Sequence, residues 1–113
     1  MRLDDISGIL GCEILGAAQC DIDVDVVVAS DGMSEILAFY SPHALMLTGL
    51  TNVQSVRTAV VADVQVIVYV RGKRPTDRVL QLAREKRIPV LATTLGMFDC
   101  CGLLYRAGLR GAM

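Results

Sequence analysis

The chain has 113 residues, with 12 acidic and 11 basic side chains, which fits one domain with a formal net charge of −1. Apolar residues make up 53%, well above the content of disordered chains, whereas aromatic residues make up only 4%. A near-neutral charge excludes a general nucleic-acid binder, because counterion release needs a basic face. No stretch is long and apolar enough to span a bilayer, and no export signal is visible. We expect one cytoplasmic domain over residues 1–113, with neither nucleic acid nor membrane as a partner.

The first predicted elements are a helix and a short strand. Apolar residues recur at helical spacing over residues 3–10, with Asp4 or Asp5 serving the N-terminal end. Gly11 suits the end of this helix. Residues 12–15 form an apolar piece that predicts a small strand. These elements predict a helix-plus-strand unit at the N-terminus.

Three aspartates alternate with apolar residues in the next segment. Asp21, Asp23 and Asp25 follow period two, which predicts a strand with one face in water. A calcium loop would need a glycine and a distal glutamate that this segment lacks. A solvated strand face is therefore the favoured interpretation, and we expect no metal site here.

From residue 24 onward, a strand, a turn and a helix recur four times. The predicted strands are aliphatic, without alternation, and cover residues 24–29, 44–47, 64–70 and 90–92. The predicted helices begin after Gly32, where one carries Ile36, Leu37 and Tyr40, and continue at residues 53–62, from Pro75 to residue 86, and at residues 97–105. Thr51 with Gln54 predicts a capping box, and Pro75 suits a first helical turn.

Strands that are apolar on both faces are covered by helices on both faces, which is typical of a parallel sheet. The sequence therefore predicts an α/β fold, a three-layer sandwich with a mostly parallel sheet of about four strands.

The four cysteines, Cys12, Cys20, Cys100 and Cys101, form no common metal or cluster spacing. We interpret them as buried thiols in a reducing compartment, with redox sensing as an open alternative. No cofactor is predicted.

Polar side chains follow each predicted parallel strand, at the end of the sheet where ligands bind in this fold class. They are Ser30, Asp31, Thr48, Thr51, Asn52, Arg71, Lys73, Thr93 and Thr94. Helix N-termini favour anions there, and Arg71 and Lys73 add positive charge. This pattern predicts a pocket for a carboxylate, a phosphate or a nucleotide. Ordinary helix capping by the same residue types is the alternative.

No catalytic motif accompanies these residues. The phosphate loop, the nucleophile elbow and the zinc-protease motif are absent, and the single histidine, His43, lies in a predicted loop. A nucleophile–base pair cannot be assembled. The least favoured interpretation is a small enzyme that uses Asp31 with Arg71 or Lys73.

The surface is expected to hold an interface between identical chains. The mean hydropathy is +0.50, and a short domain leaves some of its aliphatic residues at the surface. Acidic residues dominate positions 1–35 and basic residues dominate positions 71–87, which favours attraction between copies. We predict a homodimer, with the last helix as the contact through Met97, Phe98, Leu103, Leu104 and Tyr105.

Three segments, residues 44–53, 66–75 and 88–94, resemble the DRTGG domain. That domain occurs in the regulatory part of long bacterial phosphotransacetylases beside CBS domains, and in short stand-alone proteins. Residues 3–16 and 27–34 are similar to the N-terminal domain of HPr kinase/phosphorylase and, more distantly, to that of Mur ligases. Where the family has its signature, this chain has Thr51-Asn52 and residues 71–73, of which only Gly72 matches.

The resemblance implies a fold like the N-terminal domain of HPr kinase and a non-catalytic regulatory role. The expected ligand is a small anionic metabolite or a nucleotide at the carboxyl ends of the strands. The alternative is a protein-interaction module that assembles with a separately encoded kinase or metabolic enzyme.

Overall fold

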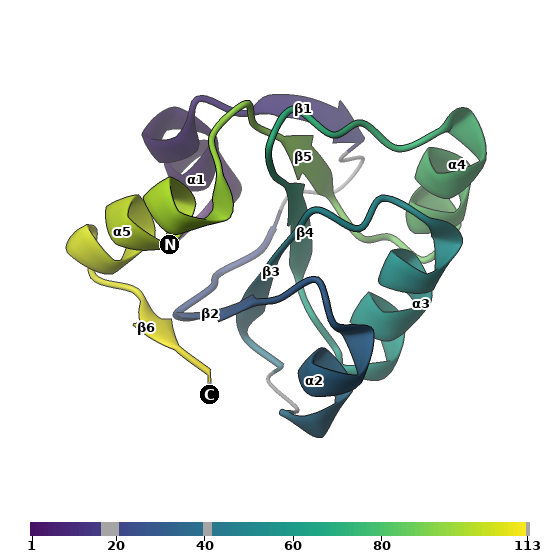
Figure 1. Cartoon of the computed structure of the whole chain (residues 1–113), viewed down its shortest axis with the longest axis horizontal. Coiled ribbons are helices and arrows are strands. Elements are labelled where there is room, and N and C mark those ends of the chain that lie inside the picture. The colour runs from purple at the N-terminus through teal and green to yellow at the C-terminus, as the bar shows by residue number, and fades with distance from the viewer. Residues whose placement is uncertain (17–20, 40–41, 113) are drawn as a thin grey trace.

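Six strands form one mixed sheet in the computed structural model, which describes residues 1–16, 21–39 and 42–112 (Figure 1). Their order across the sheet is β1-β5-β4-β3-β2-β6. The strands are β1 Glu13–Gly16, β2 Val26–Ala29, β3 Ala44–Thr48, β4 Val66–Tyr69, β5 Val90–Ala92 and β6 Arg110–Gly111. Cys20, predicted as a buried thiol, and Tyr40, predicted on the helix after Gly32, lie outside the described residues.

The centre of the sheet is parallel, as predicted. Strands β2 to β5 run in the same direction, β6 pairs parallel with β2, and β1 pairs antiparallel with β5. The prediction of about four strands was too low by the two edge strands. Strand β6 has only two exposed residues and no hydrophobic pattern, so its pairing comes from the chain's return after the last helix.

Five helices cover the two faces of this sheet (Figure 1). Helices α1 and α5 lie on one face, and α2, α3 and α4 lie on the other. Their bounds are α1 Leu3–Leu10, α2 Met33–Ala38, α3 Val53–Val61, α4 Asp77–Glu85 and α5 Met97–Arg106. None of the described helices is long and apolar enough to cross a membrane.

Successive residues of the central strands pack into different cores. Met46 and Ile67 belong to the core under α2 to α4, whereas Leu45, Leu47 and Val68 belong to the core under α1 and α5. All five are fully buried. This arrangement follows from the alternation of side chains along a strand, and it confirms the prediction of three layers.

The segment with alternating aspartates is not a strand. Ile22 and Val24 are buried and the three aspartates are exposed, so the predicted alternation of burial is present. However, β2 begins only at Val26. The Val24 amide donates to the Met1 carbonyl at 2.9 Å, and the terminal amine of Met1 lies 2.7 Å from Asp23. Residues 23 and 24 therefore pair with the chain's own N-terminus, and the segment joins the sheet only from Asp25, whose amide donates to the His43 carbonyl at 3.2 Å.

The predicted cap of α3 and the predicted start of α4 differ from the structure by one or two residues. Asn52 caps α3 by accepting the Ser55 amide at 3.2 Å, so the capping box at Thr51 was wrong. Thr76 caps α4, which places Pro75 before the helix instead of in its first turn. Neighbouring residues with equal capping tendency cannot be ranked from sequence, because backbone geometry decides which side chain reaches the free amide.

Candidate functional site

An ion pair bridges the carboxyl ends of the central strands. Asp31 follows β2 and Arg71 follows β4, and the end of β3 lies between them. The Arg71 guanidinium donates to Asp31 Oδ2 at 2.9 Å, and Asp31 Oδ1 accepts the Gly49 amide at 2.7 Å. The Thr48 hydroxyl donates to the same oxygen at 3.3 Å. The structure thus brings three predicted residues together, Asp31, Thr48 and Arg71.

The backbone after β4 turns Arg71 across the end of β3. Arg71 has a φ of 62° and Gly72 a φ of 69°, and a non-glycine residue rarely adopts this left-handed conformation. The Arg71 amide donates to Leu95 at 2.7 Å and the Gly72 amide to Thr93 at 2.9 Å. These two bonds tie the loop after β4 to the loop after β5, which holds the left-handed turn in place.

Gly49 permits the guanidinium of Arg71 to lie directly over the backbone. A Cβ atom at position 49 would collide with this guanidinium. Glycine therefore permits this close approach, and a larger residue would displace the flexible end of the Arg71 side chain. A single glycine after a strand has no pattern of its own, so the role of Gly49 was not predictable from its position in the sequence.

Asp31 remains ionised and neutralises Arg71. The Gly49 amide, together with the Arg71 guanidinium and the Thr48 hydroxyl, holds the pKa of Asp31 below its usual value, although partial burial acts in the opposite direction. The ion pair is accessible to solvent, because the Arg71 and Asp31 side chains are 42% and 50% exposed. Lys73, two residues further on, is exposed, and its ammonium has no partner in the part of the chain that the structure describes. The loop after β4 therefore carries two paired cations, Arg71 and Arg74, the latter 2.8 Å from Glu13, and one free cation, Lys73.

Other predicted site residues serve the local structure. The buried Thr93 hydroxyl donates to the Leu10 carbonyl at 2.8 Å and accepts the Leu95 amide at 3.2 Å, which fixes the end of α1. The Ser30 hydroxyl accepts the Gly32 amide at 2.9 Å and donates to Glu35 at 3.2 Å. These contacts agree with the capping alternative.

The remaining predicted residues stand at the same edge without contact to the ion pair. Asn52 caps α3, Thr51 is half-buried and Thr94 is exposed. The side chains of Thr51 and Thr94 make no hydrogen bond among the described residues. They are free to contact a ligand, and their role stays a prediction.

A buried polar pair lies near the site and was also missed. The Ser55 and Tyr69 hydroxyls are 2.7 Å apart, and Ser55 also donates to the Asn52 carbonyl at 2.7 Å. Burial raises the pKa of Tyr69, so its hydroxyl keeps its proton. The pair joins the start of α3 to the end of β4. Its only sequence signal is a tyrosine at the end of an otherwise aliphatic strand.

The described cysteines are protonated thiols. Burial raises the pKa of Cys12 to about 12 and that of Cys100 to about 11, with smaller contributions from neighbouring groups. Cys100 is buried as predicted, whereas Cys12 and Cys101 are half-buried. Among the described residues, no cluster of three or more histidine, cysteine or acidic side chains is arranged to hold a metal ion.

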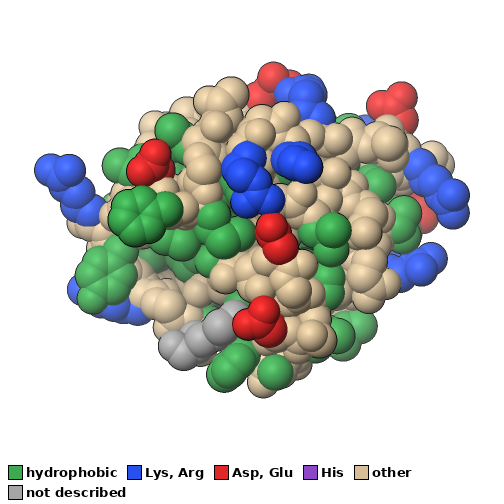
Figure 2. Space-filling model, viewed as in Figure 1, with side chains coloured by type: hydrophobic (Ala, Val, Ile, Leu, Met, Phe, Trp, Pro, Cys, Tyr) green, Lys and Arg blue, Asp and Glu red, His purple; other side chains and the backbone are tan. Residues whose placement is uncertain are grey.

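An apolar hollow lies beside α5, and neither Asp31 nor Arg71 lines it. Its volume is about 230 Å³, and most of its lining is aliphatic or aromatic. The lining residues are Val27, Ala29, Cys101, Tyr105, Leu109, Arg110 and Gly111. Figure 2 shows hydrophobic side chains gathered over this part of the surface. This hollow is distinct from the charged strand ends.

Comparison with known proteins agrees with this fold. The structure is similar to the crystal structure of the CBS and DRTGG domains of the regulatory region of Clostridium perfringens pyrophosphatase, which was solved with its activator, diadenosine tetraphosphate. The TM-score is 0.72 at 17% identity, and the match covers 95% of this chain and 47% of that chain. The chain thus spans about half the length of that structure, and the likeness at this identity shows the fold.

Sequence comparison identifies the family. No curated protein matches the chain significantly. The family model of the DRTGG domain matches residues 5–107, which is nearly the whole sequence. The chain therefore belongs to the DRTGG domain family.

Proposed function

We propose that the chain is a non-catalytic regulatory domain that binds a small anionic metabolite or a nucleotide at the carboxyl ends of β2 to β5. The observation that carries this proposal is the placement of Arg71. Its left-handed backbone and the absence of a side chain at Gly49 hold the guanidinium across the strand ends, with the free ammonium of Lys73 in the same loop. Such an arrangement suits an anion with several oxygen atoms.

Family membership supports a sensing role. The solved structure with the same fold belongs to the regulatory region of an enzyme and carries a nucleotide activator. A nucleotide is a phosphate-bearing anion, which is the ligand class that two cations at the strand ends would select. The similarity to the N-terminal domain of HPr kinase and to phosphotransacetylases stays a prediction, as does a cytoplasmic location.

Asp31 gives the site a means of responding to its ligand. A phosphate that reaches Arg71 competes with Asp31 for the same guanidinium, because both are oxyanions. Asp31 also accepts the Gly49 amide, so its position is coupled to the end of β3. Ligand binding then changes the contacts between the loops after β2, β3 and β4, and this change is the signal that a neighbouring domain or enzyme could read.

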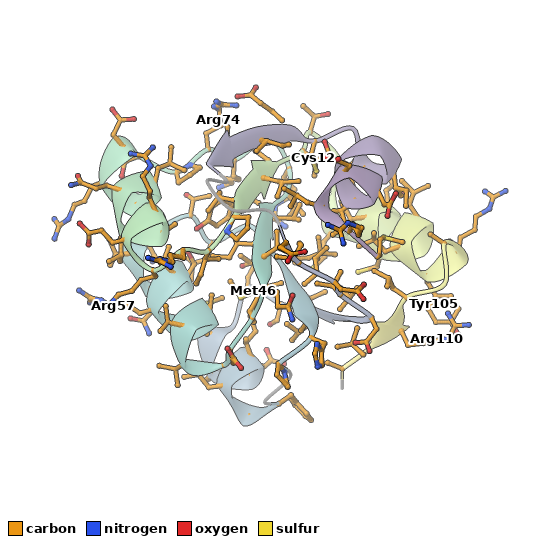
Figure 3. All side chains as sticks on the ribbon, turned by 180° about the vertical axis from the view of Figure 1, so that it is seen from behind. Cys12, Met46, Arg57, Arg74, Tyr105 and Arg110 are labelled. Atoms are coloured by element: carbon orange, nitrogen blue, oxygen red, sulfur yellow. The ribbon has the colours of Figure 1, made fainter. Side chains whose placement is uncertain are left out.

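A thermal-shift screen tests the proposal. The purified chain is screened against nucleotides, acyl phosphates and keto acids, and an anion that binds the folded state raises the melting temperature. We expect Arg71→Ala and Lys73→Ala each to remove most of that rise. Arg57→Ala is the matched control, because Arg57 lies on α3, away from the strand ends, and points outward (Figure 3).

Two results would contradict this function. A rise in melting temperature that survives both substitutions would place the ligand elsewhere. A complete screen without any stabilising anion would favour the alternative, a module that binds a separately encoded enzyme.

A further inference from the structure

The outer side of α5 exposes two aromatic side chains to solvent. The inner side of this helix buries Cys100 and Leu104 in the core. On the outer side, Phe98 is 89% exposed and Tyr105 is 62% exposed. Their spacing of seven residues places them on one stripe, two turns apart.

Gly102 lies between these two aromatic residues on the same stripe. A Cβ atom at this position would meet nothing within 4 Å, so the chain's own packing does not require glycine. Glycine inside a helix is unfavourable relative to alanine, both in backbone entropy and in propensity. A small residue in the middle of an exposed apolar stripe permits another helix to approach closely.

The hollow beside α5 completes this surface. Two helices cover one face of the six-stranded sheet and three cover the other, which leaves the β2–β6 edge uncovered next to α5 (Figure 1). The hollow has a volume of about 230 Å³, and Val27, Ala29 and Tyr105 contribute to its lining. The Arg110 guanidinium lies 4.3 Å from the centre of the Tyr105 ring, and Arg110 also lines the hollow. Figure 3 shows Tyr105 and Arg110 together at this edge.

A projecting aromatic residue and a hollow thus lie on the same face of one chain. Such a surface is self-complementary, as a two-fold interface between identical chains requires. We propose that α5 packs antiparallel against α5 of a second copy of this chain, about a two-fold axis at Gly102. Phe98 then lies over the partner's Tyr105 and beside the hollow.

The charges on α5 fit this arrangement. Asp99 and Arg106 are exposed on one flank of α5, about 100° around the helix axis from Phe98 and Tyr105. Neither has an ion-pair partner among residues 1–16, 21–39 and 42–112. In an antiparallel pair centred on Gly102, Asp99 of each copy faces Arg106 of the other. A parallel pair would set this charged flank against the partner's aromatic flank, so only the antiparallel arrangement brings Asp99 and Arg106 together.

Light scattering at micromolar concentration tests for the pair. We expect a mass of twice 12.2 kDa for the native chain, and a monomer for Phe98→Glu and for Gly102→Leu. Val61→Glu is the matched control, because Val61 is 70% exposed on α3, on the opposite face, and we expect it to leave the dimer intact. A native monomer, or a dimer that persists in both α5 variants, would overturn the proposal.

Charge exchange tests the antiparallel register. Asp99→Lys and Arg106→Glu should each weaken the dimer by roughly tenfold, because each places like charges together twice per dimer. The double variant should recover most of the native affinity, provided that circular dichroism shows it folded. Gly102→Ala gives an independent measure: it should raise helix stability in the monomer while weakening the dimer. Single variants without effect on the dimer, together with an unchanged Gly102→Ala dimer, would refute this register.

Discussion

Replacing Asp31 by alanine or by asparagine separates its two structural roles. Asp31 accepts the amide of Gly49, which is buried, and it pairs with Arg71, which is partly exposed. Alanine removes both interactions. Asparagine keeps an oxygen that can accept the Gly49 amide, but it removes the charge that attracts Arg71.

The two losses differ in magnitude. A buried amide without an acceptor costs about 1–3 kcal/mol in the free energy of unfolding. The ion pair contributes at most about 1 kcal/mol, because both of its side chains are about half exposed and solvent screens their attraction. We therefore expect Asp31→Ala to cost about 2–3 kcal/mol and Asp31→Asn about 1 kcal/mol or less.

Urea unfolding followed by circular dichroism measures both values. Asp25→Asn is the control, because the Asp25 side chain is exposed and has no hydrogen bond among the described residues. The stability difference between the native chain and Asp31→Asn should also depend on pH. The folded state lowers the pKa of Asp31 below its ordinary value of 3.8. The contribution of the carboxylate is therefore complete above that pH and is lost as the pH falls further, through the lowered pKa.

Equal losses in the two variants would refute this division of roles, as would an Asp31→Ala variant as stable as the native chain. A stability difference between the native chain and Asp31→Asn that grows as the pH falls below 3.8 would contradict the lowered pKa.

Three further predictions concern the surroundings of the site. Gly49→Ala should weaken anion binding as much as loss of Arg71 does. The free energy of unfolding should change by less than about 1 kcal/mol, because the reduced freedom of the unfolded chain offsets the lost ion pair. Calorimetry with a stabilising anion measures the binding and urea unfolding measures the stability; anion binding at full affinity would argue against the contact between Arg71 and Gly49. Thr93→Val should lower the free energy of unfolding by about 1–3 kcal/mol, because the Leu10 carbonyl and the Leu95 amide lose a partner; an unchanged urea midpoint would refute this. The pKa of Cys100 is raised from 9.0 to about 11, so its thiol should react with iodoacetamide roughly a hundredfold more slowly in the native chain than in urea. Mass spectrometry measures the two rates, and similar rates would show an accessible thiolate.

The central sheet was predictable because its strands are buried on both faces. All four residues of β4 are buried, and an aliphatic run of that length between helical patterns indicates a parallel strand. The edges were less predictable. Strand β6, Arg110–Gly111, has no apolar pattern, and β1 was predicted as a strand without a partner in the sheet. Edge pairing depends on where the chain returns in space, which local sequence does not encode.

The candidate site was predictable as a region but not as a set of contacts. Polar residues after parallel strands meet at one edge, so the chain order predicted their neighbourhood. The pairing of Asp31 with Arg71 depends on β3 lying between β2 and β4, and on the left-handed conformation of Arg71. The contact between the Arg71 guanidinium and Gly49 follows from the same conformation. Each of these facts requires the sheet order before any side chain can be placed.

A nuclear magnetic resonance titration tests the proposed function most directly. The anion that stabilises the chain most in the thermal-shift screen is added to the isotope-labelled chain, and backbone amide shifts are followed. We predict that the largest changes occur at Gly49 and at residues 71–73, and that Arg71→Ala removes them. Changes confined to the hollow beside α5 or to the opposite ends of the strands, with Gly49 and residues 71–73 unaffected, would contradict an anion site at the strand ends.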